Sequence, residues 1–244
     1  MFKMTLENKS ILITGAAQRV GRALALAAAD AGANLIIHYG TSQSEALKTQ
    51  AAIQAKGRQA HLLQADLNDL EQTLQLIERA SQIHSIYALV NNASIFEPLT
   101  WQDTTPQDWQ RNLQVNLTAP FFLSQAFARQ LPDGESGRIV NLLDWRALRP
   151  AADHLPYTIS KAALAALTRS LAAALAPRIQ VNGLALGAVL PPSDGGDTQG
   201  VLKNVPAQRW ANLEEICQAL LFLLEGPEYI TGEIIHLDGG RHII

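Results

Sequence analysis

The sequence has a single cysteine among its 244 residues, and this scarcity already limits what the protein can be. One thiol cannot form an internal disulfide, and sparse cysteine is typical of proteins from a reducing compartment such as the cytosol. Cys217 stands in an apolar helical pattern, where it is most simply a core residue. Disulfide-stapled secreted folds are therefore excluded.

Basic clusters and long apolar runs are also missing. Lys and Arg total 19 against 22 Asp and Glu, for a net charge of −3, and no block of Lys and Arg occurs, so a nucleic-acid partner is not expected. No run of about 18 apolar residues is present, and residues 1–15 show no apolar signal core, so no membrane partner is expected. We expect a cytoplasmic protein with a small-molecule substrate and no metal.

Short β-rich runs alternate with longer helical patterns along the chain. This alternation predicts parallel strands joined by right-handed crossover helices. The predicted strands are 10–14, 34–38, 59–65, 86–91, 138–143, 180–184 and 233–237, and the predicted helices are 18–31, 43–56, 68–81, 106–130, 156–176 and 212–224. We therefore predict an α/β protein over 1–244, a single-domain doubly wound Rossmann fold with a seven-stranded parallel sheet and helices on both faces. Residues 188–206 are predicted to form a substrate lid.

The first predicted strand runs directly into TGAAQRVG and then a helix. This order presents backbone N–H groups and the positive end of a helix dipole, which suit a pyrophosphate. Gly15 is expected to make the turn and Gly21 to let helix and strand pack closely. Arg19 stands where the Rossmann fingerprint often has a glycine; it is either a solvated residue at a helix start or a contact to a cofactor phosphate.

The second predicted strand lacks the acid that usually binds the ribose 2′-hydroxyl of NAD. The segment reads IIHYGTSQS, in which His38, Thr41 and Ser42 are donors. Because Arg19 can reach the same side, a 2′-phosphate would be accepted there, so NADP is predicted and NAD is the less favoured cofactor.

The next two predicted strands end in further candidate site residues. Asp66 follows the third strand, where its carboxylate could accept the adenine amino group or cap the next helix. The fourth strand ends in NNASIF, whose small side chains let the backbone close on a flat ligand, and Phe96 could either stack on a planar ring or pack in the core.

Tyr157 and Lys161 lie four residues apart in a predicted helix, and therefore on one face of it. Such a spacing alone is more often an ordinary surface pair. At about 5 Å and an effective dielectric constant near 20, the ammonium would stabilise the phenolate by roughly 3 kcal/mol, which would lower the pKa of Tyr157 from about 10 to about 8. Asn116 stands in an apolar helix, where its amide needs partners such as a backbone carbonyl or a water leading to Lys161.

Five motifs together resemble the short-chain dehydrogenases/reductases over essentially the whole chain. They are TGAAQRVG at 14–21, NNAS at 91–94, Asn116, Tyr157 with Lys161, and DGG at 238–240. Usual members carry a catalytic Ser 13 residues before the Tyr, at the position that Asp144 holds here. That Asp, Arg19, the run ending in Phe96 and the HYxxS segment are similar to the pteridine reductase branch, and DGGRH at 238–242 is similar to dihydromonapterin reductases.

The resemblance implies an NADPH-dependent reductase of a pteridine-like ring, such as a dihydropterin or dihydrofolate, in a homotetramer. It implies that Asp144 and Tyr157 donate the proton and that Lys161 holds the nicotinamide ribose. The predicted catalytic residues are Asn116, Asp144, Tyr157 and Lys161. The predicted cofactor-binding residues are Gly15, Arg19, Val20, His38, Ser42, Asp66, Leu67, Asn92, Ala93, Ser94, Tyr157, Lys161 and Gly187, and the predicted substrate-binding residues are Ser94, Phe96, Asp144 and Tyr157.

Other interpretations stay open. Asp144 could be a turn residue or mark a degraded site, although a carboxyl group bonds a ring nitrogen or an exocyclic amine better than a hydroxyl group does. Leu186 stands where the family usually has Pro, and Thr41 where pteridine reductases commonly have Arg. A carbonyl or 3-oxoacyl reductase is the second hypothesis. A dinucleotide-binding regulatory protein without turnover is the third.

Overall fold

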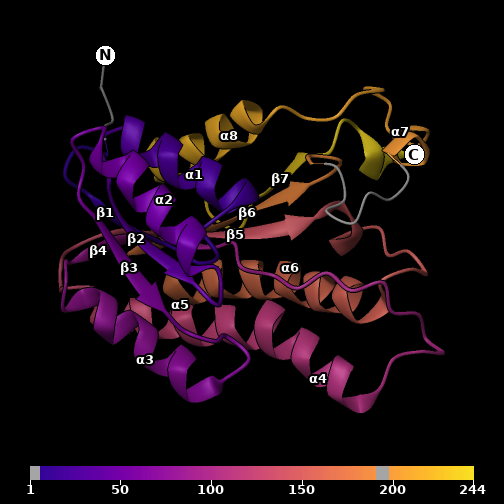
Figure 1. The fold of residues 1–244 in the computed structure, drawn as a ribbon, viewed down its shortest axis with the longest axis horizontal. Coiled ribbons are helices and arrows are strands. Elements are labelled where there is room, and N and C mark those ends of the chain that lie inside the picture. Colours follow the sequence, from indigo (N-terminus) through magenta and orange to yellow (C-terminus); the bar gives the residue numbers. More distant parts are fainter. Residues whose placement is uncertain (1–5, 191–197) are drawn as a thin grey trace.

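The computed structural model describes residues 6–190 and 198–244, in which one seven-stranded sheet is the central layer. All strands are parallel, in the order β3-β2-β1-β4-β5-β6-β7 (Figure 1). The strands are β1 (Ser10–Ile13), β2 (Asn34–Tyr39), β3 (Ala60–Gln64), β4 (Ile86–Asn91), β5 (Gly137–Asp144), β6 (Ile179–Leu186) and β7 (Ile234–Leu237). The predicted fold class is confirmed.

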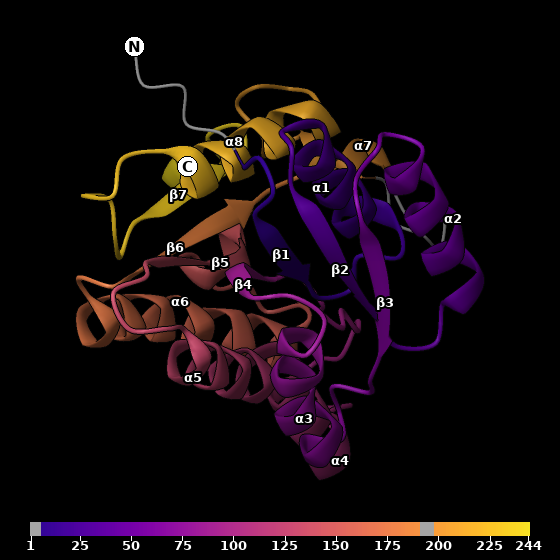
Figure 2. The same ribbon diagram turned by 90° about the vertical axis from the view of Figure 1, so that its left-hand side faces the viewer.

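Helices cover both faces of the sheet (Figure 2). One face carries α1 (Arg19–Asp30), α2 (Gln43–Gln54) and α8 (Leu213–Glu225), and the other carries α3 (Leu70–Ser81), α4 (Pro106–Leu113), α5 (Ala119–Gln130) and α6 (Leu155–Leu175). Their ends lie within a few residues of the predicted bounds. No helix within the described residues has the length and apolar character that a membrane span requires.

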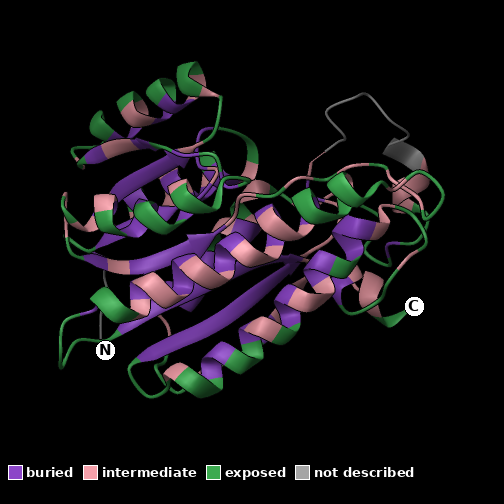
Figure 3. Ribbon diagram, turned by 90° about the horizontal axis from the view of Figure 1, so that it is seen from below, coloured by how far each residue is buried: buried purple, intermediate pink, exposed green. Residues whose placement is uncertain are grey.

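Two hydrophobic cores lie on the two faces of the sheet. Ile11 and Ile13 pack in the core with residues of α1 and α8, whereas Leu12, between them, packs in the core with residues of α3 and α5. A strand that is buried on both faces has apolar residues at nearly every position, so these strands could be predicted from continuous apolar runs in the sequence. Figure 3 shows the sheet as a buried layer and the outer sides of the helices as exposed.

Two predicted segments differ from the structure. The helix predicted over 106–130 is interrupted by a π-helical turn, η1 (Gln114–Thr118), between α4 and α5. The predicted lid at 188–206 contains a short helix, α7 (Thr198–Leu202), while residues 191–197 of it lie outside the described residues. The lid therefore stays a prediction.

The chain reverses its direction of strand addition at β1, which pairs with β2 on one side and β4 on the other. In open parallel sheets, ligands bind beyond the carboxyl ends of the strands at such a switch point. The register brings the ends of β1, β4 and β5 to that edge.

Candidate active site

The turn between β1 and α1 requires glycine at both of its ends. Gly15 has a φ of 64°, and a Cβ on Gly21 would lie 2.2 Å from the Gly15 carbonyl oxygen and 2.6 Å from Asn92 Nδ2. The helix α1 begins without a side-chain cap and without an acid in its first turn. No negative side chain in this first turn therefore offsets the positive N-terminal end of the α1 dipole. The negative pyrophosphate of a dinucleotide fits this place.

Arg19 opens α1 in a left-handed conformation, with a φ of 53°. A non-glycine residue in this region carries strain on the order of 1 kcal/mol, and such strain gathers at functional positions. The residue is exposed at the turn, and Val20 next to it is half-buried. The chain therefore keeps an arginine where glycine would be easier to accommodate.

His38 does not face the site as a donor, which corrects the sequence prediction. Its ring is buried, Nδ1 accepts the N–H of Gly15 at 3.1 Å, and Nε2 donates to the Ala65 carbonyl oxygen at 3.1 Å. Burial lowers the pKa of His38 to about 4, so the ring is neutral. The imidazole fixes the glycine turn instead of binding a cofactor phosphate.

The remaining residues predicted for the adenosine side lie at the ends of β2 and β3. Ser42 is half-buried at the start of α2, Asp66 is exposed, and Leu67 is buried. Asp66 Oδ1 accepts the N–H of Asn68 at 2.9 Å, whereas Asp69 caps α3. The alternative interpretation of Asp66 as the helix cap is therefore wrong.

The segment after β4 is fastened to the glycine turn. Thr14 Oγ1 accepts the N–H groups of Asn92 and Ala93 at 2.9 and 3.0 Å, and the Asn92 side chain donates to the Thr14 carbonyl oxygen at 2.8 Å. The Ala93 Cα would lie 3.0 Å from a Cβ on Gly15. These bonds bring two predicted cofactor contacts to the switch point.

Asn116 occupies the π-helical turn and joins two parts of the site. Its Oδ1 accepts from Ser94 Oγ and the Ile95 N–H at 3.1 and 2.9 Å, and its Nδ2 donates to the Ile95 carbonyl oxygen and to Ser160 Oγ at 3.0 and 3.1 Å. The expected backbone carbonyl partner is thus confirmed. Three of the four bonds hold the loop after β4 and the fourth reaches Ser160 of α6, so Asn116 is a positioning residue.

Asp144, Tyr157 and Lys161 meet at the end of β5. Tyr157 Oη donates to Asp144 Oδ2 at 3.1 Å, and Lys161 Nζ donates to the Leu142 carbonyl oxygen at 2.7 Å and lies 5.8 Å from the centre of the Tyr157 ring. Tyr157 and Lys161 are buried. The three groups predicted to form the catalytic centre are brought together.

The pKa of Tyr157 differs from the sequence prediction. Burial and the adjacent Asp144 raise the pKa of the phenol well above its ordinary value, whereas the prediction was a lowered pKa. Burial also raises the pKa of Asp144 and lowers that of Lys161 to about 8. The prediction considered the ammonium but not the carboxyl group, which is hydrogen-bonded to the phenol. Tyr157 therefore holds its proton firmly at neutral pH.

An aromatic layer that the sequence did not reveal lies beside Tyr157. The Phe96 ring is stacked on His154, with centroids 3.8 Å apart at 10°, and contacts Tyr157 edge-to-face at 4.7 Å. Phe96 is 53% exposed, so the interpretation of it as a core residue is wrong. His154 has a φ of 50° immediately before α6, and no motif marks it.

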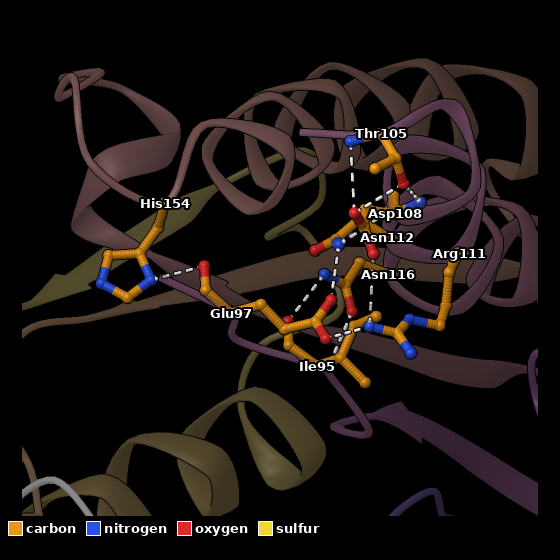
Figure 4. Close-up of polar contacts among 8 residues, drawn as sticks. All are labelled: Ile95, Glu97, Thr105, Asp108, Arg111, Asn112, Asn116 and His154. Carbon is orange, nitrogen blue, oxygen red and sulfur yellow. Dashed lines mark hydrogen bonds and ion pairs between the residues drawn. The ribbon is translucent and has the colours of Figure 1, made fainter. Parts of the chain in front are cut away.

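A polar network holds the loop that carries Phe96 (Figure 4). The Glu97 carboxylate accepts from Arg111 and from Asn112 Nδ2, and its backbone carbonyl accepts from His154 Nδ1 at 2.8 Å. Asp108 and Thr105 close the capping box at the start of α4. The loop is therefore held from α4 on one side and from the start of α6 on the other.

Gly187 lies at the end of β6, against the end of β7. A Cβ at this position would lie 2.5 Å from the Asp238 Cα, so only glycine fits. Its N–H donates to the Leu237 carbonyl oxygen at 3.0 Å. Elsewhere in the described residues, no group of three His, Cys, Asp or Glu is placed to hold a metal ion.

Comparisons with known proteins agree with this geometry. Residues 9–199 match the short chain dehydrogenase family. The chain is 32% identical to the 3-oxoacyl-[acyl-carrier-protein] reductase FabG of Staphylococcus epidermidis over 97% of this chain and 100% of that protein. It is 35% identical to FolM alternative dihydrofolate reductase 1 of Brucella canis, solved in complex with NADP, with a TM-score of 0.91 over 98% of this chain and 96% of that chain. A short chain dehydrogenase of Burkholderia cenocepacia, also solved with NADP, is 34% identical with a TM-score of 0.91 over 97% and 98% of the two chains.

Proposed function

Since this chain belongs to the short chain dehydrogenase family, we propose that it is an NADPH-dependent reductase of a C=N bond in a pteridine-like ring, of the dihydropterin or dihydrofolate type. The observation that carries the proposal is the hydrogen bond between Tyr157 Oη and Asp144 Oδ2, beside the exposed ring of Phe96. A donor, a carboxyl group and an aromatic face are what a flat nitrogen heterocycle needs.

The residues at the switch point fit NADP. The uncapped start of α1 suits the pyrophosphate, and Arg19 and Ser42 would contact the 2′-phosphate. Lys161 would hold the nicotinamide ribose near Tyr157. Bound NADPH would supply the hydride. The NADP complexes of the Brucella and Burkholderia proteins support this choice of cofactor.

Tyr157 supplies the proton in the proposed reaction. Its raised pKa keeps the proton on Oη until a ring nitrogen that is gaining electrons accepts it. Asp144 Oδ2 accepts the phenol's hydrogen bond, and its own raised pKa suits it to share a proton with an exocyclic amine or ring nitrogen. A serine hydroxyl in this place could bond to a ketone oxygen but could not serve a heterocycle in this way.

Phe96 would bind the ring of the substrate with the exposed part of its own ring. The stack and the Glu97 network hold Phe96 before any ligand arrives, so little ordering cost is left for binding. The similarity to the Brucella dihydrofolate reductase favours this substrate class over others in the family.

A 3-oxoacyl reductase is the second candidate, because the Staphylococcus epidermidis FabG and several other relatives at 30–32% identity carry that name. NADPH oxidation with a panel of dihydrobiopterin, dihydrofolate, an acetoacetyl thioester and simple ketones separates the candidates. Activity on ketones or thioesters alone would contradict the pteridine proposal. Protection from unfolding by NADPH without any oxidation would favour the regulatory hypothesis.

Two variants test the roles of the catalytic pair. Tyr157→Phe is expected to lower turnover by about 100-fold or more with NADPH affinity retained, because proton transfer of this kind contributes 100- to 10,000-fold. Asp144→Ser is expected to reduce pterin turnover more than ketone turnover. Unchanged turnover in the first variant, or equal losses in the second, would contradict the assignment.

Two further features remain predictions of the sequence and the family resemblance: assembly as a homotetramer and location in the cytoplasm. Sedimentation of the purified protein tests the first, and fractionation of the source cells tests the second.

A further inference from the structure

A small cavity lies against Trp145, the residue that follows the proposed catalytic Asp144. Its volume is about 260 Å³, and its lining residues are Trp145, Arg149, Asn204, Arg241 and Ile244. These residues come from the turn after β5, from the segment after α7 and from the C-terminal turn η3 (Arg241–Ile243). The charge of Asp144 acts on the Arg241 guanidinium, so the cavity lies on the Asp144 side of the proposed site.

Two arginines that form no salt bridge with any described residue line this cavity. Within the described residues, neither Arg149 nor Arg241 has a carboxylate within 4.0 Å, whereas Arg146 nearby is paired with Asp153 at 2.8 Å. The Arg241 guanidinium lies 4.0 Å from the centre of the Trp145 ring. Burial and the charge of Arg146 lower the pKa of Arg241, and the more distant charges of Asp144, Asp153 and Asp238 offset this only in part.

One long hydrogen bond also links the two arginines. Arg149 Nη1 donates to the Arg241 backbone carbonyl oxygen at 3.5 Å, and the indole of Trp145 supports the Arg241 side chain. Guanidinium groups bind carboxylates and phosphates through paired N–H bonds, and positioning them in advance reduces the cost of binding.

We propose that this cavity binds an anionic group, a carboxylate or a phosphate, carried on a substituent of the substrate. The inference rests on the proposed function, because it assumes that the ring to be reduced lies against Asp144 and Tyr157. A substituent that leaves the ring on the Asp144 side meets Trp145 first and the two guanidinium groups next. The volume holds a carboxylate or phosphate group with a few linking atoms, since one water takes about 30 Å³. The reductase would then favour anionic pteridines over neutral ones.

Steady-state kinetics with two pterins test the proposal. Dihydrofolate carries two carboxylates, and dihydrobiopterin carries none. In the double variant Arg149→Gln/Arg241→Gln, KM for dihydrofolate is expected to rise at least tenfold, while KM for dihydrobiopterin changes less than twofold. Arg241→Lys is expected to retain part of the preference for dihydrofolate over dihydrobiopterin. Arg129→Gln, an exposed arginine on α5, is the matched control for loss of charge. Equal changes for both pterins, or no change for dihydrofolate, would overturn the proposal.

Calorimetric binding separates this proposal from the proposed function. p-Aminobenzoyl-L-glutamate and inorganic phosphate are titrated into the NADPH-loaded wild type, the double variant and the Arg129→Gln control. Binding to wild type and control but not to the double variant supports the anion site even if no pterin is reduced, and the ligand that binds distinguishes a carboxylate source from a phosphate source. Absence of binding to the wild type by both probes at millimolar concentration refutes it, even if pterins are turned over.

Discussion

Replacing Lys161 by Met removes a positive charge that the fold buries almost completely. The side chain is 3% exposed, and burial lowers its pKa from 10.5 to about 8. A group whose pKa is depressed in the folded state binds fewer protons there than in the unfolded chain, so the contribution of Lys161 to stability rises as pH increases from about 8 to 10.5. The shift of about 2.5 units corresponds to a cost of about 3 kcal/mol at pH 7, of which about 2 kcal/mol disappears by pH 9.5.

The assay is urea unfolding of the wild type and of Lys161→Met at pH 7 and pH 9.5, at one protein concentration. The variant also loses the bond to the Leu142 carbonyl, but that loss does not depend on pH. We therefore compare the difference in unfolding free energy, Lys161→Met minus wild type, at the two pH values. This difference is expected to be about 2 kcal/mol more favourable to the variant at pH 7 than at pH 9.5. Turnover should fall sharply at the same time, because the ribose contact is lost.

The matched control is Lys48→Met, since the Lys48 side chain is 67% exposed. Its stability should follow the wild-type pH dependence. Parallel curves for the wild type and Lys161→Met would refute the claim that the fold suppresses the charge of this lysine.

Three further perturbations test the frame of the site. In the folded wild type, the pKa of the His38 imidazole is lowered from 6.5 to about 4, so between pH 7 and pH 5 the unfolded chain takes up a proton that the folded protein does not. Between these pH values, His38→Gln should therefore lose about 2 kcal/mol less unfolding free energy than the wild type loses. Equal losses in urea unfolding would contradict this. Gly21→Ala should weaken NADPH binding at least tenfold in a fluorescence titration, because its Cβ would collide with the Gly15 carbonyl oxygen; unchanged affinity would contradict a cofactor role for the turn. Asn116→Ala should cost about 2 kcal/mol of unfolding free energy and reduce turnover, because it leaves the half-buried backbone groups at Ile95 unpaired; a loss below about 1 kcal/mol would show that the four bonds matter little.

The sheet could be predicted because of how its strands are buried. Ile11, Leu12 and Ile13 alternate between two cores, so the strand is apolar throughout and stands out from the amphipathic helices around it. The place of the site followed from the same prediction, because the carboxyl ends of parallel strands meet at one edge. Asp144, which ends β5, was singled out by the family resemblance, because it stands 13 residues before Tyr157, where the family usually has Ser.

Side-chain partners across the fold could not be predicted. The spacing of Tyr157 and Lys161 places them on one helix face, but the pKa of the phenol is raised by burial and by a carboxyl group that another element brings. His38 was expected to be a donor to the cofactor because no sequence pattern shows that both ring nitrogens are bonded to backbone. His154 lies in a left-handed conformation that no neighbouring glycine signals.

The π-helical turn at Gln114–Thr118 limits how this segment can change in length. Such a turn holds one residue more than the α-helical turn it replaces, and one residue corresponds to about 100° of rotation around the axis. The extra residue lets Asn116 face the loop at Ile95 while Leu123 and Phe127 of α5 still enter the core. Removing one residue here would restore an unbroken helix, but it would turn either Asn116 or the core-facing residues of α5 away from their partners. The segment should therefore accept substitutions of its solvent-facing residues far more readily than the deletion of one residue.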